Sequence, residues 1–102
     1  MTKEEIIARL LKHRPELEAA GVEHVSLFGS VARDEATDES DIDVLVRLED
    51  SIAHSGFGYF GALERLKDRL EAMFGKSVDV ISEPIMKERL AREIERDKIV
   101  AF

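Results

Sequence analysis

The sequence predicts a small α/β or α+β domain in which helices pack on a mixed sheet of three to four strands. Short apolar segments with strand character occur at 24–28, 41–48 and 78–82. Segments with apolar residues at helical spacing lie between these strands and at both ends. The chain has 102 residues, of which 44% are hydrophobic, and this is enough for one core without disulfides or metal. We therefore expect a single domain over residues 1–102.

The first segment is predicted to be helical. Thr2 and Glu5 have the spacing of a capping box, in which each side chain pairs with a backbone N–H of the other residue. Pro15 breaks this helix or opens a new turn, because proline lacks the N–H that a helix interior needs. The segment ends at Gly21, since glycine favours helix C-termini. The apolar residues of the first helical face are Ile6, Ile7, Leu10 and Leu11.

Two strands joined by a polar turn follow. His24–Phe28 is predicted to be a short strand that ends at Gly29, and a short helix is expected from Ser30 to about Glu35. Residues 36–40 (ATDES) have the composition of a turn. The next segment, DIDVLVRL, alternates in the manner of a strand with two unlike faces. One face carries Ile42, Val44, Val46 and Leu48, and the other carries Asp41, Asp43, Leu45 and Arg47.

The C-terminal half is predicted to contain two helices and a third strand. Apolar residues of the longer helix recur at helical spacing, so we expect Phe60 to lie in the core. The alternative is an exposed patch of Phe57, Tyr59 and Phe60 that contacts a partner or a base. Glycine again marks the end of that helix. The predicted elements are, in order, a loop at 50–58, a helix from Phe57 to Gly75, a strand at 78–82, a helix from Pro84, and a strand or packing segment at 99–102.

Composition narrows the class of function. The net charge is −7, from 22 acidic and 15 basic residues, which argues against broad, charge-driven binding to DNA or RNA. The absence of cysteine excludes disulfides and thiolate metal sites. No signal peptide is visible, and no apolar run approaches the roughly 20 residues of a membrane-spanning helix. We therefore expect a cytoplasmic protein with no membrane partner and no direct nucleic-acid partner.

Three acidic residues occupy unusual positions. Asp41 and Asp43 point the same way from one strand, about 7 Å apart, although Asp41 can also be read as a turn residue. Asp79 is a lone acid in an apolar strand, and it faces the same point if the two strands are neighbours. Clustered carboxylates would repel one another and raise their pKa values. Two Mg²⁺ ions would relieve this repulsion, because hard oxygen ligands suit that ion.

A Gly-Ser pair precedes the acids. Gly29 lets the backbone come close to a phosphate, and Ser30 adds a hydroxyl near the N-terminus of the short helix, where free N–H groups favour anions. Gly-Ser after a strand is common, and alone it is weak evidence. Together with Asp41, Asp43 and Asp79, it describes a nucleoside-triphosphate site.

These motifs resemble the nucleotidyltransferase superfamily that includes DNA polymerase beta, and within it the minimal nucleotidyltransferases, or MNT proteins. The matching segments are GSVAR at 29–33, SDIDVLV at 40–46, VDVI at 78–81 and the ending KERLAREIERDKIVAF. The resemblance therefore covers nearly the whole chain. One departure is Asp34, where the family often has glycine.

The resemblance implies roles for each motif residue. Asp41 and Asp43 would hold both Mg²⁺ ions, and Asp79 would complete the site of the ion that activates the acceptor hydroxyl. Gly29 and Ser30 would bind the β- and γ-phosphates of ATP. The hydroxyl would then attack the α-phosphate in line and release pyrophosphate. Two readings stay open for Arg33, which would either contact phosphate or form surface ion pairs.

The resemblance also implies a partner. Larger members of the superfamily carry an acceptor domain, whereas the core uses nearly all of these 102 residues. MNT proteins are antitoxins that transfer AMP to a tyrosine of a HEPN-type toxin, an RNase, so we expect a hetero-oligomer with such a toxin. An alternative is an antitoxin that neutralises the toxin by binding alone. A stand-alone transferase for small molecules is disfavoured because an acceptor domain is missing.

Overall fold

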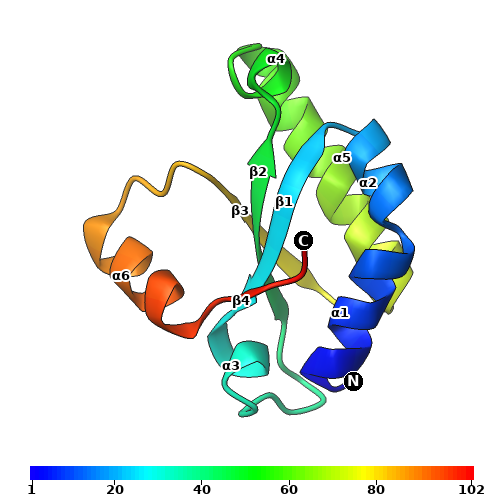
Figure 1. Ribbon diagram of the computed structural model, residues 1–102, viewed down its shortest axis with the longest axis vertical. Coiled ribbons are helices and arrows are strands. Elements are labelled where there is room, and N and C mark those ends of the chain that lie inside the picture. Colours follow the sequence, from blue (N-terminus) through cyan, green and yellow to red (C-terminus); the bar gives the residue numbers. More distant parts are fainter.

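The computed structural model describes all residues 1–102 and contains a four-stranded sheet in the order β3-β2-β1-β4 (Figure 1). β1 is antiparallel to both of its neighbours, whereas β2 and β3 are parallel. The expectation of a mixed sheet of three to four strands with helices is therefore confirmed. The strands are β1 (Val22–Phe28), β2 (Ile42–Leu48), β3 (Val78–Ser82) and β4 (Ile99–Val100).

Helices cover both faces of the sheet. On one face lie α1 (Lys3–Lys12), α2 (Arg14–Ala19) and α5 (Phe57–Phe74), and on the other lies α6 (Glu88–Asp97) (Figure 1). Two short helices, α3 (Gly29–Ala32) and α4 (Asp50–Ala53), follow β1 and β2. None of the helices is long and apolar enough to cross a membrane.

The alternation of β2 decides which side chains meet which helices. Its apolar face is buried in the large core that α1, α2 and α5 share with the sheet. Its other face carries Asp43 and the buried Leu45, which packs with Phe28 and with Ile94 of α6. The two faces predicted for this strand are confirmed, except that the strand begins at Ile42 and leaves Asp41 just outside it. The large core includes Ile6, Leu10, Leu17, Val25, Leu27, Ile42, Val44, Val46, Leu66, Leu70, Phe74 and Val78.

The predicted signals at the N-terminus are confirmed, except that the Glu5 carboxylate contacts the Thr2 hydroxyl at 3.4 Å and not the Thr2 backbone N–H. The Thr2 hydroxyl accepts a hydrogen bond from the Glu5 amide at 3.1 Å and so caps α1. Pro15 stands in the first turn of α2, where its missing N–H costs nothing. Gly21 ends the helical segment with a φ of +94°. β1 starts at Val22, earlier than predicted, because Val22 is buried opposite Leu48.

Three predictions for the C-terminal half were wrong. Part of the expected 50–58 loop is the helical turn α4. The last helix begins at Glu88 rather than at Pro84, because Ile85 packs against the smaller core before the helix starts. Phe60 is 66% exposed, and Phe57 is 94% exposed. The start of α5 projects past the end of the sheet (Figure 1), so only its later residues Leu66, Leu70 and Phe74 are buried.

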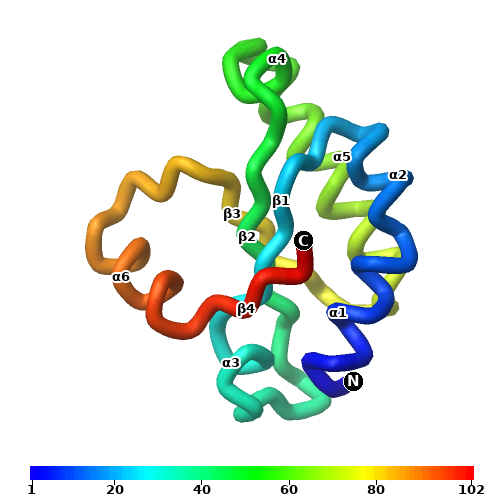
Figure 2. Tube along the Cα trace, in the orientation of Figure 1, coloured from blue at the N-terminus to red at the C-terminus, as the bar shows by residue number.

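The C-terminal tail is both a strand and a packing segment. It runs beside β1 and ends on the side of α1 and α2 (Figure 2). The amide of Val25 donates to the carbonyl of Phe102 at 3.0 Å, and the Phe102 side chain is only 9% exposed. The guanidinium of Arg14 lies 4.9 Å from the centre of the Phe102 ring. Phe102 thus attaches the end of the tail to the core, in addition to the pairing of β4 with β1.

Replacing that anchor should loosen the tail. We expect Phe102→Ala to lower the free energy of unfolding by about 2–3 kcal/mol, near the lower end for a large-to-small core change. Val100 in the same tail is 60% exposed, so the control Val100→Ala should cost less than about 0.5 kcal/mol. Urea denaturation of both variants measures the difference. Equal losses for the two variants would show that Phe102 does not anchor the tail.

Candidate active site

Two of the predicted acids face each other across neighbouring strands. Asp43 of β2 is paired in register with Asp79 of β3, and with Phe28 of β1 on its other side. Paired residues on neighbouring strands point to the same face and lie about 4.8 Å apart. The expectation that these strands are neighbours is therefore confirmed, and the structure brings the two carboxylates together.

The three acids differ in exposure. Asp43 is partly buried, whereas Asp79 is exposed and Asp41, which precedes β2, is exposed as well. Burial raises the pKa of the Asp43 carboxyl to about 6, and the carboxylates of Asp79 and Asp41 raise it in the same direction, while Arg33 lowers it. The innermost acid therefore lies in a field of uncompensated negative charge, which a cation would relieve.

The donor set suits a hard divalent cation, because Mg²⁺ prefers carboxylate oxygens. In the conformation of the structure, however, no group of three or more acidic or histidine side chains converges closely enough to hold an ion. The geometry thus brings Asp43 and Asp79 to one point of the sheet without forming a closed ligand cage. Joint metal binding by Asp41, Asp43 and Asp79 remains a prediction.

Gly29 is coupled directly to Asp43. Its φ is +73°, a backbone conformation that residues other than glycine rarely adopt. A Cβ atom at position 29 would collide with Oδ2 of Asp43. Glycine is therefore needed at this turn for two reasons, and the second is the close approach of a predicted catalytic acid. The Gly-Ser pair and the acidic strand form one packed unit.

The turn continues into a helix that is shorter than predicted. α3 ends at Ala32 instead of near Glu35, and the partly exposed Ser30 lies in its single turn beside Gly29. Asp34 follows with a φ of +59°. Asp tolerates this left-handed conformation better than most residues other than glycine. Its carboxylate also accepts a 2.8 Å hydrogen bond from Lys3 of α1.

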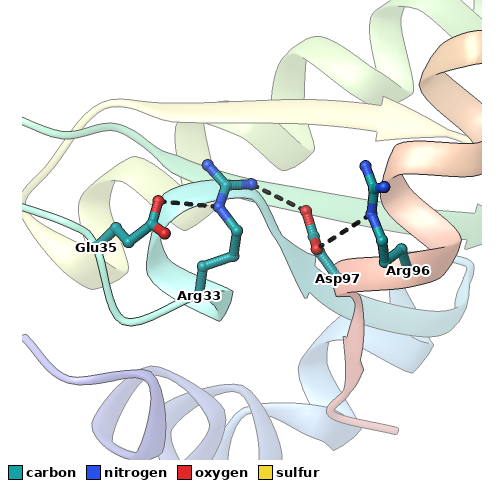
Figure 3. A network of polar contacts seen from close by, with 4 residues as sticks. All are labelled: Arg33, Glu35, Arg96 and Asp97. Carbon is teal, nitrogen blue, oxygen red and sulfur yellow. Dashed lines mark hydrogen bonds and ion pairs between the residues drawn. The ribbon is translucent and has the colours of Figure 1, made fainter.

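Arg33 forms ion pairs within the chain. Its Nε donates to Glu35 at 3.1 Å, and its Nη1 donates to Asp97 of α6 at 2.9 Å (Figure 3). Of the two readings open for Arg33, ion pairing is the one that the structure shows directly. Arg47, on the same face of β2 as Asp43, pairs with Glu23 at 3.5 Å and not with the predicted catalytic acids.

A hollow of about 480 Å³ adjoins this turn. Gly29, Arg33 and Phe28 form one side of it, and α6 forms the other side with Leu90, Glu93, Ile94, Arg96 and Asp97. No sequence pattern indicates that α6 contributes to the site, because its contacts depend on the pairing of β4 with β1. The hollow adjoins the acids only through Gly29, which approaches Asp43, and none of the three acids lines it.

A family model described as "Nucleotidyltransferase domain" matches residues 6–101. The match includes the Gly29 turn and all three acids. The chain belongs to this nucleotidyltransferase family. Family membership and the paired acids agree, because nucleotidyl transfer needs carboxylates close to a phosphate-binding turn.

Two similar proteins are named for nucleotidyl transfer. The chain is 34% identical over 100 residues to the protein adenylyltransferase MntA of Thermococcus cleftensis, covering 97% of this chain and 95% of the relative. It also resembles a solved structure described as a minimal nucleotidyltransferase, with 34% identity, a TM-score of 0.73, and coverage of 97% and 95% of the two chains. Family, fold and length therefore agree with a minimal nucleotidyltransferase.

A more distant likeness concerns the fold alone. A chain in the solved complex of a tri-AMPylated HEPN toxin with an MNT antitoxin from Shewanella oneidensis matches with a TM-score of 0.65 and 17% identity. The match covers 95% of this chain and 71% of that chain. The same sheet and helices thus occur in a protein from a toxin–antitoxin complex.

The contact between Gly29 and Asp43 can be tested by a double-mutant cycle. Gly75 has a φ of +65° with open space where a Cβ would stand, so Gly75→Ala should cost only the backbone strain, about 1 kcal/mol. Gly29→Ala should cost at least about 1 kcal/mol more, because the new methyl group meets the Asp43 carboxylate. In an Asp43→Ala background this excess should disappear. An excess that persists there would contradict the contact.

The raised pKa of Asp43 predicts a pH-dependent stability. Between about pH 4 and pH 6 the unfolded carboxyl ionises while the folded one keeps its proton, so ionised Asp43 destabilises the fold above about pH 6. Without added metal, Asp43→Asn should therefore stabilise the protein by about 1 kcal/mol at pH 8, a figure reduced for partial exposure.

This gain should vanish as the pH falls below about 4, where both states of the wild type are protonated. Urea denaturation across the pH range measures it, and the exposed Asp38→Asn is the charge-matched control. A gain that is equal at pH 8 and pH 4, or equal in the control, would refute the assignment.

Proposed function

We propose that this protein transfers AMP from ATP, with Mg²⁺ as cofactor, to a tyrosine hydroxyl of a partner HEPN toxin and thereby acts as its antitoxin. The observation that carries the proposal is the pairing of Asp43 with Asp79 beside the Gly29 turn. A bound cation would relieve the repulsion between these adjacent carboxylates, which otherwise weakens the fold. The similarity to MntA, a protein adenylyltransferase, supports the proposal.

Each side chain of the site has a proposed role. Asp41 and Asp43 hold two Mg²⁺ ions, and Asp79 completes the set on the acceptor side. When bound, Mg²⁺ neutralises the charge of the carboxylates and of the triphosphate. Asp79 is exposed, so it can accept the proton of an incoming hydroxyl. The hydroxyl oxygen forms a bond to the α-phosphorus while the bond to the pyrophosphate oxygen breaks.

The Gly29 turn binds the leaving phosphates. Gly29 has no side chain where the turn comes close to Asp43, so a phosphate can approach its backbone. The Ser30 hydroxyl donates one hydrogen bond to a phosphate oxygen. Arg33 lines the adjoining hollow and brings a fixed positive charge next to them. α3 has a single turn, so its dipole contributes little and the side chains do most of the binding.

The partner is proposed from the relatives. The MNT antitoxin of Shewanella oneidensis is described in complex with a tri-AMPylated HEPN toxin, and this chain has the fold of a protein in that complex. A protein acceptor also agrees with the exposed position of Asp79, which a folded partner can approach. We therefore propose a hetero-oligomer with a HEPN toxin encoded beside this protein.

Intact-mass spectrometry of that toxin tests the proposal. Incubation with this protein, ATP and Mg²⁺ should add one or more AMP units to the toxin. Chelation of the metal, or the Asp41→Asn/Asp43→Asn variant, should lower the rate by at least about 100-fold, because the charge of the phosphates is then uncompensated. Asp38→Asn should retain full activity, since Asp38 is exposed in the turn before β2 and does not belong to the proposed set of acids.

The opposite outcome is equally specific. If the toxin is silenced and elutes together with this protein while its mass does not change, neutralisation occurs by binding alone. If the mass does increase, tryptic mapping of the modified toxin distinguishes tyrosine from other acceptors. Modification at a serine or lysine would contradict the proposed acceptor but leave AMP transfer established.

A further inference from the structure

The carboxylate of Asp97 has an unusual position for a residue at the end of a helix. Its side chain is only 15% exposed, although it is charged and closes α6. Its Oδ2 accepts the 2.9 Å hydrogen bond from Nη1 of Arg33, and its Oδ1 lies 4.0 Å from Nε of Arg96 (Figure 3). Asp97 therefore joins α6 to the residue that follows the Gly29 turn.

The fold determines where Asp97 stands. The next residue, Lys98, donates its amide to the carbonyl of Ile94 at 2.7 Å, and the chain then enters β4. β4 pairs with β1 through Ile99 opposite Leu27, and β1 leads directly into Gly29. Asp97 and Arg33 are thus attached to two strands that pair with each other, Asp97 before β4 and Arg33 after β1 and α3.

The two carboxylates on Arg33 are not equivalent. The Glu35 side chain is 63% exposed, whereas that of Asp97 is 15% exposed. An exposed ion pair contributes little, whereas a charge-assisted hydrogen bond to a largely buried carboxylate is stronger. The Arg33 side chain itself is 43% exposed and donates to Asp97 through one nitrogen only. Glu35 and Asp97 accept hydrogen bonds from Nε and Nη1 of Arg33, and neither carboxylate bonds to its third nitrogen, Nη2 (Figure 3).

We propose that Asp97 is a positioning residue that holds the Arg33 guanidinium at the edge of the 480 Å³ hollow, with its third nitrogen free for a phosphate oxygen of the nucleotide. This inference rests on the proposed function. A guanidinium has donors in a fixed fork, so it can keep a carboxylate on one edge and bind a phosphate with another. Without Asp97, the long Arg33 side chain is free to leave the hollow.

The first experiment compares the steady-state kinetics of AMP transfer by variants at positions 97 and 95. Asp97→Asn should raise the KM for ATP about 5- to 10-fold while kcat changes less than about 2-fold, because binding is lost rather than chemistry. Asp97→Glu should restore most of the affinity. Glu95→Gln removes the same charge from an exposed residue of α6 that pairs with Lys98, and it should leave KM unchanged. Thermal unfolding of each variant shows that it is folded.

A double-mutant cycle separates positioning from a general structural role. In an Arg33→Met background, Asp97→Asn should raise KM no further, because its effect acts through Arg33. Arg33→Lys keeps the charge but loses the fork, and it should show an increase similar to that of Asp97→Asn. An additive cycle, or a KM that is unchanged or lower in a folded Asp97→Asn protein, would overturn the proposal.

Nucleotide binding distinguishes a failure of the proposed function from a failure of the proposed role of Asp97. Isothermal titration calorimetry with a non-hydrolysable ATP analogue and Mg²⁺ measures the nucleotide affinity of each variant in the absence of the toxin. If the wild type binds no nucleotide, the proposed function and this inference are overturned together. If the wild type binds it and Asp97→Asn binds it equally well, only the role of Asp97 is overturned.

Discussion

The site depends on one constraint, the register between β2 and β3 that sets Asp43 directly beside Asp79. A shift of β3 by one residue would turn Asp79 to the other face, away from Asp43, because the side-chain period of a strand is two. The opposite face of these strands prevents the shift, since Ile42, Val44 and Val78 are fully buried there. The hydrophobic core thus positions the acids without touching them.

Holding the acids in this place costs stability at several points. Burial and neighbouring charge raise the pKa of Asp43 to about 6, and in the adjacent chain Asp34 has a φ of +59°, which is unfavourable for residues other than glycine. Unfavourable charge and backbone strain cluster at functional sites, where the surrounding structure maintains them. Three interactions hold this turn in place: the β1–β2 pairing, the Lys3–Asp34 ion pair and the Arg33–Asp97 ion pair.

The features that were predictable from the sequence are those that local pattern determines. Alternation located β2 and β3, and an acid within an apolar strand drew attention to Asp43 and Asp79. Phe60 was misplaced because helical spacing does not reveal that the start of α5 extends past the sheet. Asp97 was missed because its meeting with Arg33 spans 64 positions and requires β4 to pair with β1. Long-range pairing, rather than local propensity, completes the site.

The way in which α6 covers its face of the sheet bears on the kind of acceptor. Its residues Leu90 and Ile94 pack on Phe28 and Leu45, but the row of acids at the edge of this patch stays open, with Asp79 more exposed than Asp43. An enzyme for a small acceptor gains from a closed site that excludes water. An acceptor on a folded protein can supply that cover itself, and an open row then allows its hydroxyl to approach. The graded exposure of the acids thus agrees with a macromolecular acceptor.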